Sequence, residues 1–365
     1  MFDTLWKPTP SLFGLNKRMR LAVGAVWFYR CRHISAYTRD ARAQARRKEA
    51  ETHLKNQNPL LSGKIRLTAK HRFPGTAQTN MSVTPVQSCP TLPLSNGLQI
   101  PILGLGTSHF GGYSHDAIVY ALTECGMRHI DTAKRYGCEE KLGEAIRQSE
   151  IPRGDLWLTN KLWPGDYGYK AAKKACLDSR SQMGVEYFDL YLMHWPGSMR
   201  PGCSNRELRA ETWRALEELY KEGVCRAIGV SNFLVHHLQQ LKEDCSIVPH
   251  VNQVEYHPFQ QPNHLMEYCH QEGIVFEGYS PLAKGQALND PTVLQIAEKY
   301  RRTPAQICIR WSIQNNVVTI PKSTKHKRIQ ENCEVFEFQL EESDMAALGA
   351  LHDDRHVTWD PTNVE

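Results

Sequence analysis

The sequence predicts an α/β fold, a (β/α)8 barrel, for residues 91–365. Short apolar runs rich in β-branched residues alternate with helical stretches, and this alternation gives eight strand–helix units. Eight units form a TIM barrel, whose parallel strands are short and apolar because helices cover them. A doubly wound sheet is the alternative, because it shows the same alternation. That fold usually carries Gly-x-Gly-x-x-Gly after its first strand, whereas Gly104-Leu-Gly106 continues as Thr-Ser-His-Phe-Gly111.

A short β-hairpin is expected at the start of the barrel. Two apolar runs within residues 92–100 flank Asn96-Gly97, a dipeptide typical of tight hairpin turns. The strands are then expected at residues 102–106, 128–132, 156–162, 188–194, 226–230, 250–255, 274–279 and 317–320. The helices are expected at residues 115–125, 139–149, 168–182, 206–222, 234–242, 263–272, 291–300, 304–315 and 325–331.

Residues 1–90 differ from the barrel in charge. The 365-residue chain has a formal net charge of +5, but residues 1–80 hold 16 Lys and Arg against 4 Asp and Glu, a net of +12. The remaining residues hold 28 against 35, a net of −7. An acidic body repels phosphates on average, and the basic segment carries no recognised nucleic-acid-binding motif. We therefore expect a basic extension or linker over residues 1–90 and no nucleic-acid partner.

The first part of this extension has some features of a targeting segment. Residues 1–39 contain seven basic residues and one acid, which suits a mitochondrial presequence. The apolar run at residues 21–29 lacks a following cleavage pattern and is shorter than the roughly 18 residues that a membrane-spanning helix needs. We favour a disordered extension on a cytoplasmic protein, with mitochondrial targeting as the alternative.

Eleven cysteines are scattered along the chain without a Cys-x-x-Cys pair. An odd count without close pairs argues against a disulfide framework and against a structural zinc site. We expect reduced thiols and no metal.

Polar residues stand where the predicted strands end. In a barrel the loops that follow the strands meet at one mouth, so these residues can converge although they are far apart in sequence. They are Asp131, Lys161, His194, Ser231, Asn232, Gln253 and Ser280.

Several of these residues lie in segments that resemble the aldo-keto reductase superfamily. The segments are His129-Ile-Asp-Thr-Ala-Lys-Arg-Tyr136, Thr159-Asn-Lys-Leu-Trp163, Asp189-Leu-Tyr-Leu-Met-His-Trp-Pro196, Gly229-Val-Ser-Asn-Phe233, Asn252-Gln-Val-Glu-Tyr-His-Pro258, Tyr279-Ser-Pro-Leu282 and Ile320-Pro-Lys-Ser323. They occur in this order, and the resemblance covers about residues 92–365. It implies a (β/α)8 fold, a monomer, and an NADP-dependent oxidoreductase of CH–OH donors that reduces small aldehydes or ketones.

The resemblance assigns four catalytic residues. Tyr136 is the acid/base, Lys161 and Asp131 support it, and His194 orients the substrate oxygen. The chemistry agrees, because hydride transfer to a carbonyl leaves negative charge on oxygen that needs a proton donor. Tyrosine is a reluctant donor with a pKa near 10, and a neighbouring cation stabilises its anion. Asp131 would offset the burial of that cation as an ion pair.

The resemblance also implies an NADPH/NADP+ site. Ser231, Asn232 and Gln253 carry donors and acceptors that suit a carboxamide, and Tyr279 can stack on the nicotinamide ring. Lys322, Ser323, Thr324 and Arg328 precede or enter a short helix, where cations favour the 2′-phosphate of NADPH over NADH. A solvated basic helix start is the alternative. The remaining cofactor residues are Thr107, Ser280, Leu282, Glu331 and Asn332.

Ser108, Trp163, His194 and Trp195 are the expected substrate-pocket residues. Many family members have an aromatic residue at the position of Ser108 and Asn at the position of Cys138. The segment 197–206 and the tail after Leu351 are short, which argues against a wide aromatic pocket. Cys138 lies near the expected site, where an inert thiol is favoured over a redox-active one.

A different class of function stays open at this level. The same fold and cofactor can serve a regulatory subunit that signals to a partner protein, and channel-associated members of the superfamily set that precedent. The complete set of four catalytic residues favours the enzyme.

Overall fold

The computed structural model describes residues 89–108 and 111–365. The expected extension over residues 1–90 lies almost wholly outside the described residues, so its separation from the barrel at about residue 90 stays a prediction.

The chain enters the barrel through the predicted hairpin. β1 (Thr91–Pro93) pairs antiparallel with β2 (Gln99–Pro101), and Gly97 between them has a φ of 86°. That left-handed conformation favours glycine, as the Asn-Gly turn requires. The Asn96 amide donates to the carbonyl of Arg226 at 3.0 Å, which ties the hairpin to the segment before β7.

Eight parallel strands then form one sheet in the order β10-β9-β8-β7-β6-β5-β4-β3. The two edges meet, because Leu103 bridges Thr319 in parallel and the Gly106 amide donates to the Pro321 carbonyl at 3.1 Å. This closure confirms the (β/α)8 barrel and excludes the doubly wound alternative. The strands are β3 (Leu105–Gly106), β4 (His129–Asp131), β5 (Trp157–Leu162), β6 (Leu190–Met193), β7 (Ile228–Ser231), β8 (Val251–Glu255), β9 (Val275–Tyr279) and β10 (Val318–Ile320).

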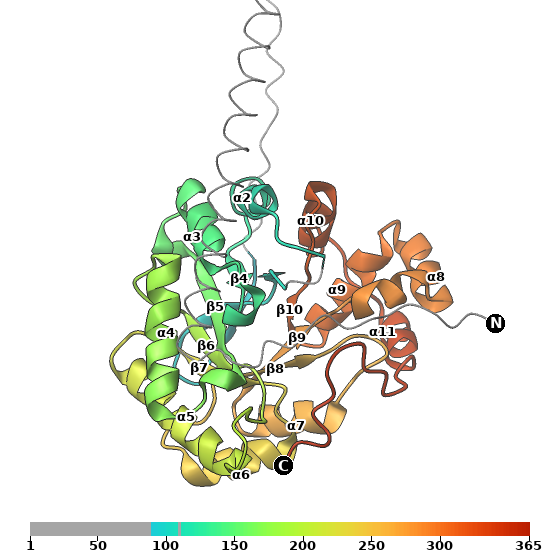
Figure 1. Ribbon diagram of the computed structural model, residues 1–365. Coiled ribbons are helices and arrows are strands. Elements are labelled where there is room, and N and C mark those ends of the chain that lie inside the picture. The colour runs from blue at the N-terminus through green and yellow to red at the C-terminus, as the bar shows by residue number, and fades with distance from the viewer. Residues whose placement is uncertain (1–88, 109–110) are drawn as a thin grey trace, which may run out of the picture. The chain divides into compact units, whose positions relative to one another are not determined.

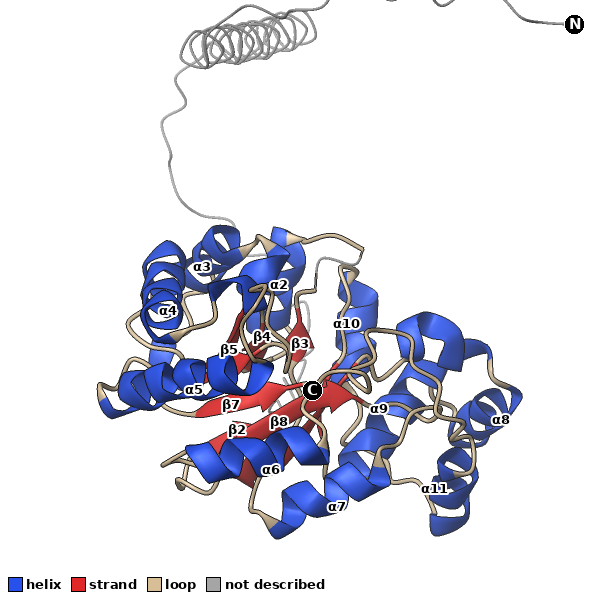
Figure 2. Ribbon diagram, turned by 60° about the horizontal axis from the view of Figure 1, so that its bottom comes forward, coloured by secondary structure: helices blue, strands red, loops and turns tan. Residues whose placement is uncertain are grey.

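Helices lie outside these strands, as the blue and red ribbons of Figure 2 show. Side-chain caps begin two of them: Asp290 accepts from the amides of Thr292 and Val293, and Thr303 accepts from the amide of Gln306. Figure 1 places the helices around the sheet: α2 (His115–Thr123), α3 (Glu139–Gln148), α4 (Tyr169–Met183), α5 (Asn205–Lys221), α6 (Val235–Asp244), α7 (Asn263–Gln271), α8 (Pro291–Tyr300), α9 (Pro304–Gln314), α10 (His326–Cys333) and α11 (Glu342–Gly349). Short 3-10 segments connect them at Lys134–Tyr136, Arg153–Asp155, Pro164–Asp166 and Ala283–Asn289.

An apolar cluster fills one end of the barrel. Ile100 of the hairpin is fully buried against residues of alternate strands, among them Leu192, Val251 and Val318. Such layers from alternate strands are the usual filling of this fold. This apolar cluster lies at the end of the barrel next to the hairpin. The opposite end, where the strands terminate, is therefore available for polar residues.

Within the described part of the chain, no helix has the length and apolar character needed to cross a membrane.

Candidate active site

The four expected catalytic residues come from three neighbouring strands. Asp131 ends β4, and Tyr136 ends the 3-10 turn that follows it. Lys161 lies in β5 and His194 directly follows β6. Because β4, β5 and β6 pair in parallel register, these ends meet at the same mouth.

Asp131 and Lys161 form a buried ion pair. The Lys161 Nζ atom lies 2.5 and 2.6 Å from the two carboxylate oxygens of Asp131, and it also donates to the Thr132 carbonyl at 3.0 Å. Burial acts to lower the pKa of Lys161, but its acidic neighbours, Asp131 foremost, together outweigh burial, so the net shift is upward. Lys161 therefore stays a cation inside the barrel.

Tyr136 lies against this cation. Lys161 Nζ is 5.4 Å from the centre of the Tyr136 ring and hydrogen-bonds to the tyrosine. Burial raises the pKa of Tyr136, and Lys161 is the main influence that opposes the rise. The Tyr136 and His194 rings meet edge to face, with centroids 5.8 Å apart. A proton donor, a cation and an imidazole therefore face one space.

The side chains expected at a carboxamide also come together. The Gln253 amide donates to Asp131 at 2.9 Å, and the Asn232 amide donates to the His194 carbonyl at 3.0 Å and to the Ser231 hydroxyl at 3.1 Å. The Tyr279 hydroxyl donates to the Asn232 side-chain oxygen at 2.7 Å. These amide and hydroxyl groups lie beside Asp131 and His194, and their chemistry fits a primary carboxamide.

Backbone geometry at two of these positions is unusual. Asn232 has a φ of 64° and Ser280 a φ of 55°, both in the left-handed region that non-glycine residues seldom adopt. Such strain gathers at functional sites, where surrounding contacts hold it in place. Leu282, two residues after Ser280, is half-buried against the core.

Thr107 lies directly beside the Asp131–Lys161 pair. Its amide and hydroxyl both donate to the Asp131 carbonyl, at 2.9 and 3.0 Å. Ser108 follows it and is half-buried. The Cys138 thiol is buried behind them, within 3.6 Å of the Thr132 hydroxyl and 3.8 Å of that of Thr107. This burial agrees with the expectation of an inert thiol.

The basic segment after β10 reaches the start of α10. Lys322 is half-buried, and burial lowers the pKa of its amine. A side-chain carbon placed on Gly111 would meet Lys322 Nζ at 2.9 Å, so the lysine lies along the loop that follows β3. Ser323 accepts from the Lys325 amide at 3.1 Å, and Thr324 is half-buried beside it.

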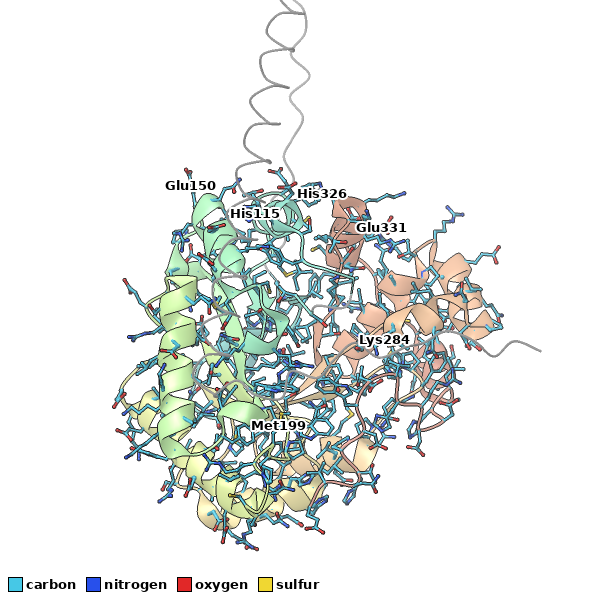
Figure 3. The ribbon with its side chains drawn as sticks, in the orientation of Figure 1. His115, Glu150, Met199, Lys284, His326 and Glu331 are labelled. Carbon is cyan, nitrogen blue, oxygen red and sulfur yellow. The ribbon has the colours of Figure 1, made fainter. Side chains whose placement is uncertain are left out.

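Within α10 the expected adenosine residues share one helix. Arg328 is exposed, Glu331 is half-buried and Asn332 is buried. Figure 3 shows His326 and Glu331 on this helix, and the ring of His326 stacks on Tyr120 of α2 with centroids 4.2 Å apart.

An aromatic rim lies beside His194, and the tail contributes to it. Trp163 packs edge-on against His194 at 5.5 Å between centroids. Trp359 lies 5.6 Å from Trp163 and 5.9 Å from Trp195, also between centroids. Three tryptophans meet here, and the expectation that the short tail argues against a wide aromatic pocket stays a prediction. Trp359 could have been singled out only as an apolar residue in a polar tail.

A second residue that the sequence analysis missed holds this tail. The buried Glu255 carboxylate, at the end of β8, accepts from the amides of Val357 and Thr358 at 2.7 and 3.1 Å and from the Thr358 hydroxyl. It also accepts from His257 at 2.9 Å. Burial acts to raise the pKa of Glu255, but these hydrogen bonds outweigh it and lower the pKa to about 2. We call this set of contacts the tail clasp.

No group of His, Cys, Asp or Glu among the described residues has an arrangement that could hold a metal ion.

Comparisons with known proteins point to one family. The model of the aldo/keto reductase family matches residues 102–353. Glyoxal reductase of Bacillus subtilis is 43% identical over 275 residues, which cover 75% of this chain and 97% of that protein. MGS-M4, a solved aldo-keto reductase enzyme from a Medee basin deep-sea metagenome library, is 41% identical with a TM-score of 0.70, covering 75% of this chain and 99% of that one. An aldo-keto reductase of Bombyx mori, solved in complex with NADP, is 32% identical with a TM-score of 0.69, covering 74% and 95%.

Proposed function

The chain belongs to the aldo/keto reductase family, and on this premise we propose that it reduces aldehydes or ketones to alcohols with NADPH. The observation that carries the proposal is the contact of Tyr136 with the buried Asp131–Lys161 pair at the barrel mouth. A tyrosine held beside a buried lysine can give up a proton that an isolated tyrosine would retain.

Bound NADPH supplies the hydride that reduces the carbonyl carbon. As negative charge develops on the carbonyl oxygen, the Tyr136 hydroxyl donates its proton to that oxygen. Lys161 stabilises the tyrosinate that remains, and Asp131 keeps Lys161 charged and in place. His194 orients the carbonyl oxygen by a hydrogen bond. The tryptophans around His194 bury the organic part of the substrate.

The donor set supports the cofactor assignment. Ser231, Asn232 and Gln253 would hold the carboxamide, and the ring of Tyr279 would cover the nicotinamide. Lys322 and Arg328 would bind the 2′-phosphate. The Bombyx mori relative, which was solved in complex with NADP, supports NADPH as the cofactor. The other proposed cofactor contacts are Thr107, Ser280, Leu282, Ser323, Thr324, Glu331 and Asn332.

A steady-state assay on the purified full chain tests the proposal. Glyoxal and nitrobenzaldehyde are tested with NADPH and with NADH, and glyoxal comes first because a relative is a glyoxal reductase. We expect consumption of NADPH with at least one aldehyde and slower consumption of NADH. Binding of NADPH without turnover of any aldehyde would contradict the proposal and favour the regulatory subunit.

A further inference from the structure

A carboxyl group that the proposed mechanism does not use lies inside the barrel next to the catalytic pair. Glu277 of β9 is fully buried. It is in register with Gln253, whose amide reaches Asp131, so both side chains face the barrel interior. His129 of β4 confirms this orientation, because its Nε2 atom lies 3.7 Å from Glu277 Oε1 although β4 and β9 are not neighbours in the sheet.

The charges around Glu277 do not balance if it ionises. Among the described residues, the titratable groups that face it are His129 and Asp131 from β4 and Lys161 from β5, while β8 presents the Gln253 amide and β10 presents the apolar Val318, its register partner. The single ammonium group already donates to both oxygens of Asp131 and to the Thr132 carbonyl. A second buried carboxylate would therefore lack a cation of its own, which is strongly unfavourable.

His129 does not supply the missing charge. Burial lowers the pKa of His129 to about 4, so its ring is neutral near pH 7. Its Nδ1 atom lies 3.2 Å from the Pro101 carbonyl, which only accepts, so Nδ1 carries the hydrogen. The Nε2 atom is then an acceptor, with the Thr159 hydroxyl 3.3 Å away and Glu277 Oε1 3.7 Å away. His129 therefore offers Glu277 neither a positive charge nor a hydrogen-bond donor, and a carboxylate at Glu277 would gain no stabilisation from it.

We propose that Glu277 is a positioning residue that remains an uncharged carboxylic acid at neutral pH. Lys161 can then interact with Asp131 and Tyr136 alone. Ionisation of Glu277 in alkaline solution weakens the interaction of Lys161 with Tyr136. The effect of ionisation on Tyr136 rests on the proposed function, whereas the protonation state of Glu277 at neutral pH does not. Burial, followed by repulsion from Asp131, raises the pKa of Glu277 to about 8, in agreement with this assignment.

The sign of the effect on stability follows from this raised pKa. The folded protein keeps the proton on Glu277 at pH values where the unfolded chain, with a normal glutamate, has lost it. The contribution of Glu277 is therefore most favourable below about pH 4.5 and is lost as the pH rises to about 8. A Glu277→Gln variant resembles the protonated form at every pH and does not share this loss.

Thermal unfolding of the full chain and of Glu277→Gln, measured between about pH 5 and about pH 9.5, tests the protonation state without reference to activity. We expect the unfolding midpoint of the wild type to fall by about 5 °C relative to the variant as the pH rises to about 8, and the difference then to level off. Glu298→Gln, at an exposed carboxyl on α8, is the matched control and should run parallel to the wild type. Parallel curves for Glu277→Gln and the wild type would overturn the proposal.

Infrared spectra of the wild type give a second readout that does not depend on how well the variant folds. We expect a band from a protonated carboxylic acid that is present near pH 7 and disappears as the pH rises through about pH 8, and its absence near pH 7 would also overturn the proposal.

Oxidation of an alcohol by NADP+ tests the catalytic consequence, because this direction needs deprotonated Tyr136. We expect the rate of Glu277→Gln to keep rising above about pH 8, where that of the wild type levels off. Coincident pH profiles in active enzyme would remove the link to Tyr136, whereas a lack of all activity would count against the proposed function alone.

Discussion

The ion pair between Asp131 and Lys161 lies inside the barrel, so removing one partner leaves a buried charge without compensation. We expect Lys161→Met to lower the free energy of unfolding by about 3–5 kcal/mol. Urea unfolding at neutral pH measures this change. Lys174→Met is the control, because Lys174 is mostly exposed in its pair with Asp178 on α4 and should cost less than about 1 kcal/mol. A loss of similar size in both variants would contradict the account of the buried pair.

At the scale of single residues, the sequence could predict which polar side chains meet at the barrel mouth but not what surrounds them. Asp131, Lys161 and His194 each stand at the end of a different strand, so a barrel alone brings them together. Glu255 also ends its strand, whereas Glu277 lies in the middle of β9. Their roles depend on which side chains from distant strands and from the tail face them, and this becomes visible only when the barrel closes.

The tail clasp is the element that positions Trp359. Hydrogen bonds to a charged group contribute roughly 1.5–3 kcal/mol each, so Glu255→Gln should loosen residues 356–359 and raise KM for an aromatic aldehyde more than for glyoxal. Trp359→Ala should produce the same selective rise. Steady-state kinetics with both substrates measures it, and equal changes for the two aldehydes would contradict the assignment of Trp359 to the pocket.

The clasp should also persist in acid. Because the folded-state pKa of Glu255 is about 2, its stabilising contribution is present above the normal glutamate pKa and is lost as the pH falls toward 2. Tryptophan fluorescence of the wild type should therefore show the tail in place at about pH 5. Release of the tail between about pH 5 and about pH 7 would disagree with this expectation.

The start of α10 is the element that we expect to select NADPH. Replacing Lys322 or Arg328 by alanine should weaken NADPH binding by roughly 10- to 100-fold and leave NADH binding nearly unchanged, because only NADPH has the 2′-phosphate. Lys327→Ala is the matched control, since this exposed lysine of the same helix faces Glu331 at 3.8 Å. Fluorescence titration gives both affinities, and equal losses for the two cofactors would refute the phosphate assignment.

Most elements could be located from the sequence, and the exceptions have physical causes. The expected helices at 291–300 and 304–315 match α8 and α9 closely, because Asp290-Pro291 and Thr303-Pro304 give strong start signals. The strand expected at 102–106 is shorter in the structure, where β3 is Leu105–Gly106. Leu103 pairs with Thr319 of β10 through an isolated bridge. α11 was not predicted, since only Leu348 of its eight residues is buried and its apolar pattern is correspondingly weak.

For the whole molecule, all proposed site residues lie between Thr107 and Asn332, and the rim is completed by Trp359. None lies in the basic segment before the barrel. We therefore expect a chain that starts at Met81 to have the same kcat/KM as the full chain with both cofactors. A marked loss of kcat/KM in the shortened chain would give residues 1–80 a part in the reaction.

The barrel as a whole serves to hold one proton donor beside one buried cation, and replacement of the donor tests this most directly. Tyr136→Phe keeps the ring and removes the proton. We expect kcat/KM for aldehyde reduction to fall by at least about 100-fold while the Kd for NADPH stays unchanged. A variant that binds NADPH normally and retains kcat/KM within about ten-fold of the wild type would contradict the assignment of Tyr136 as the acid.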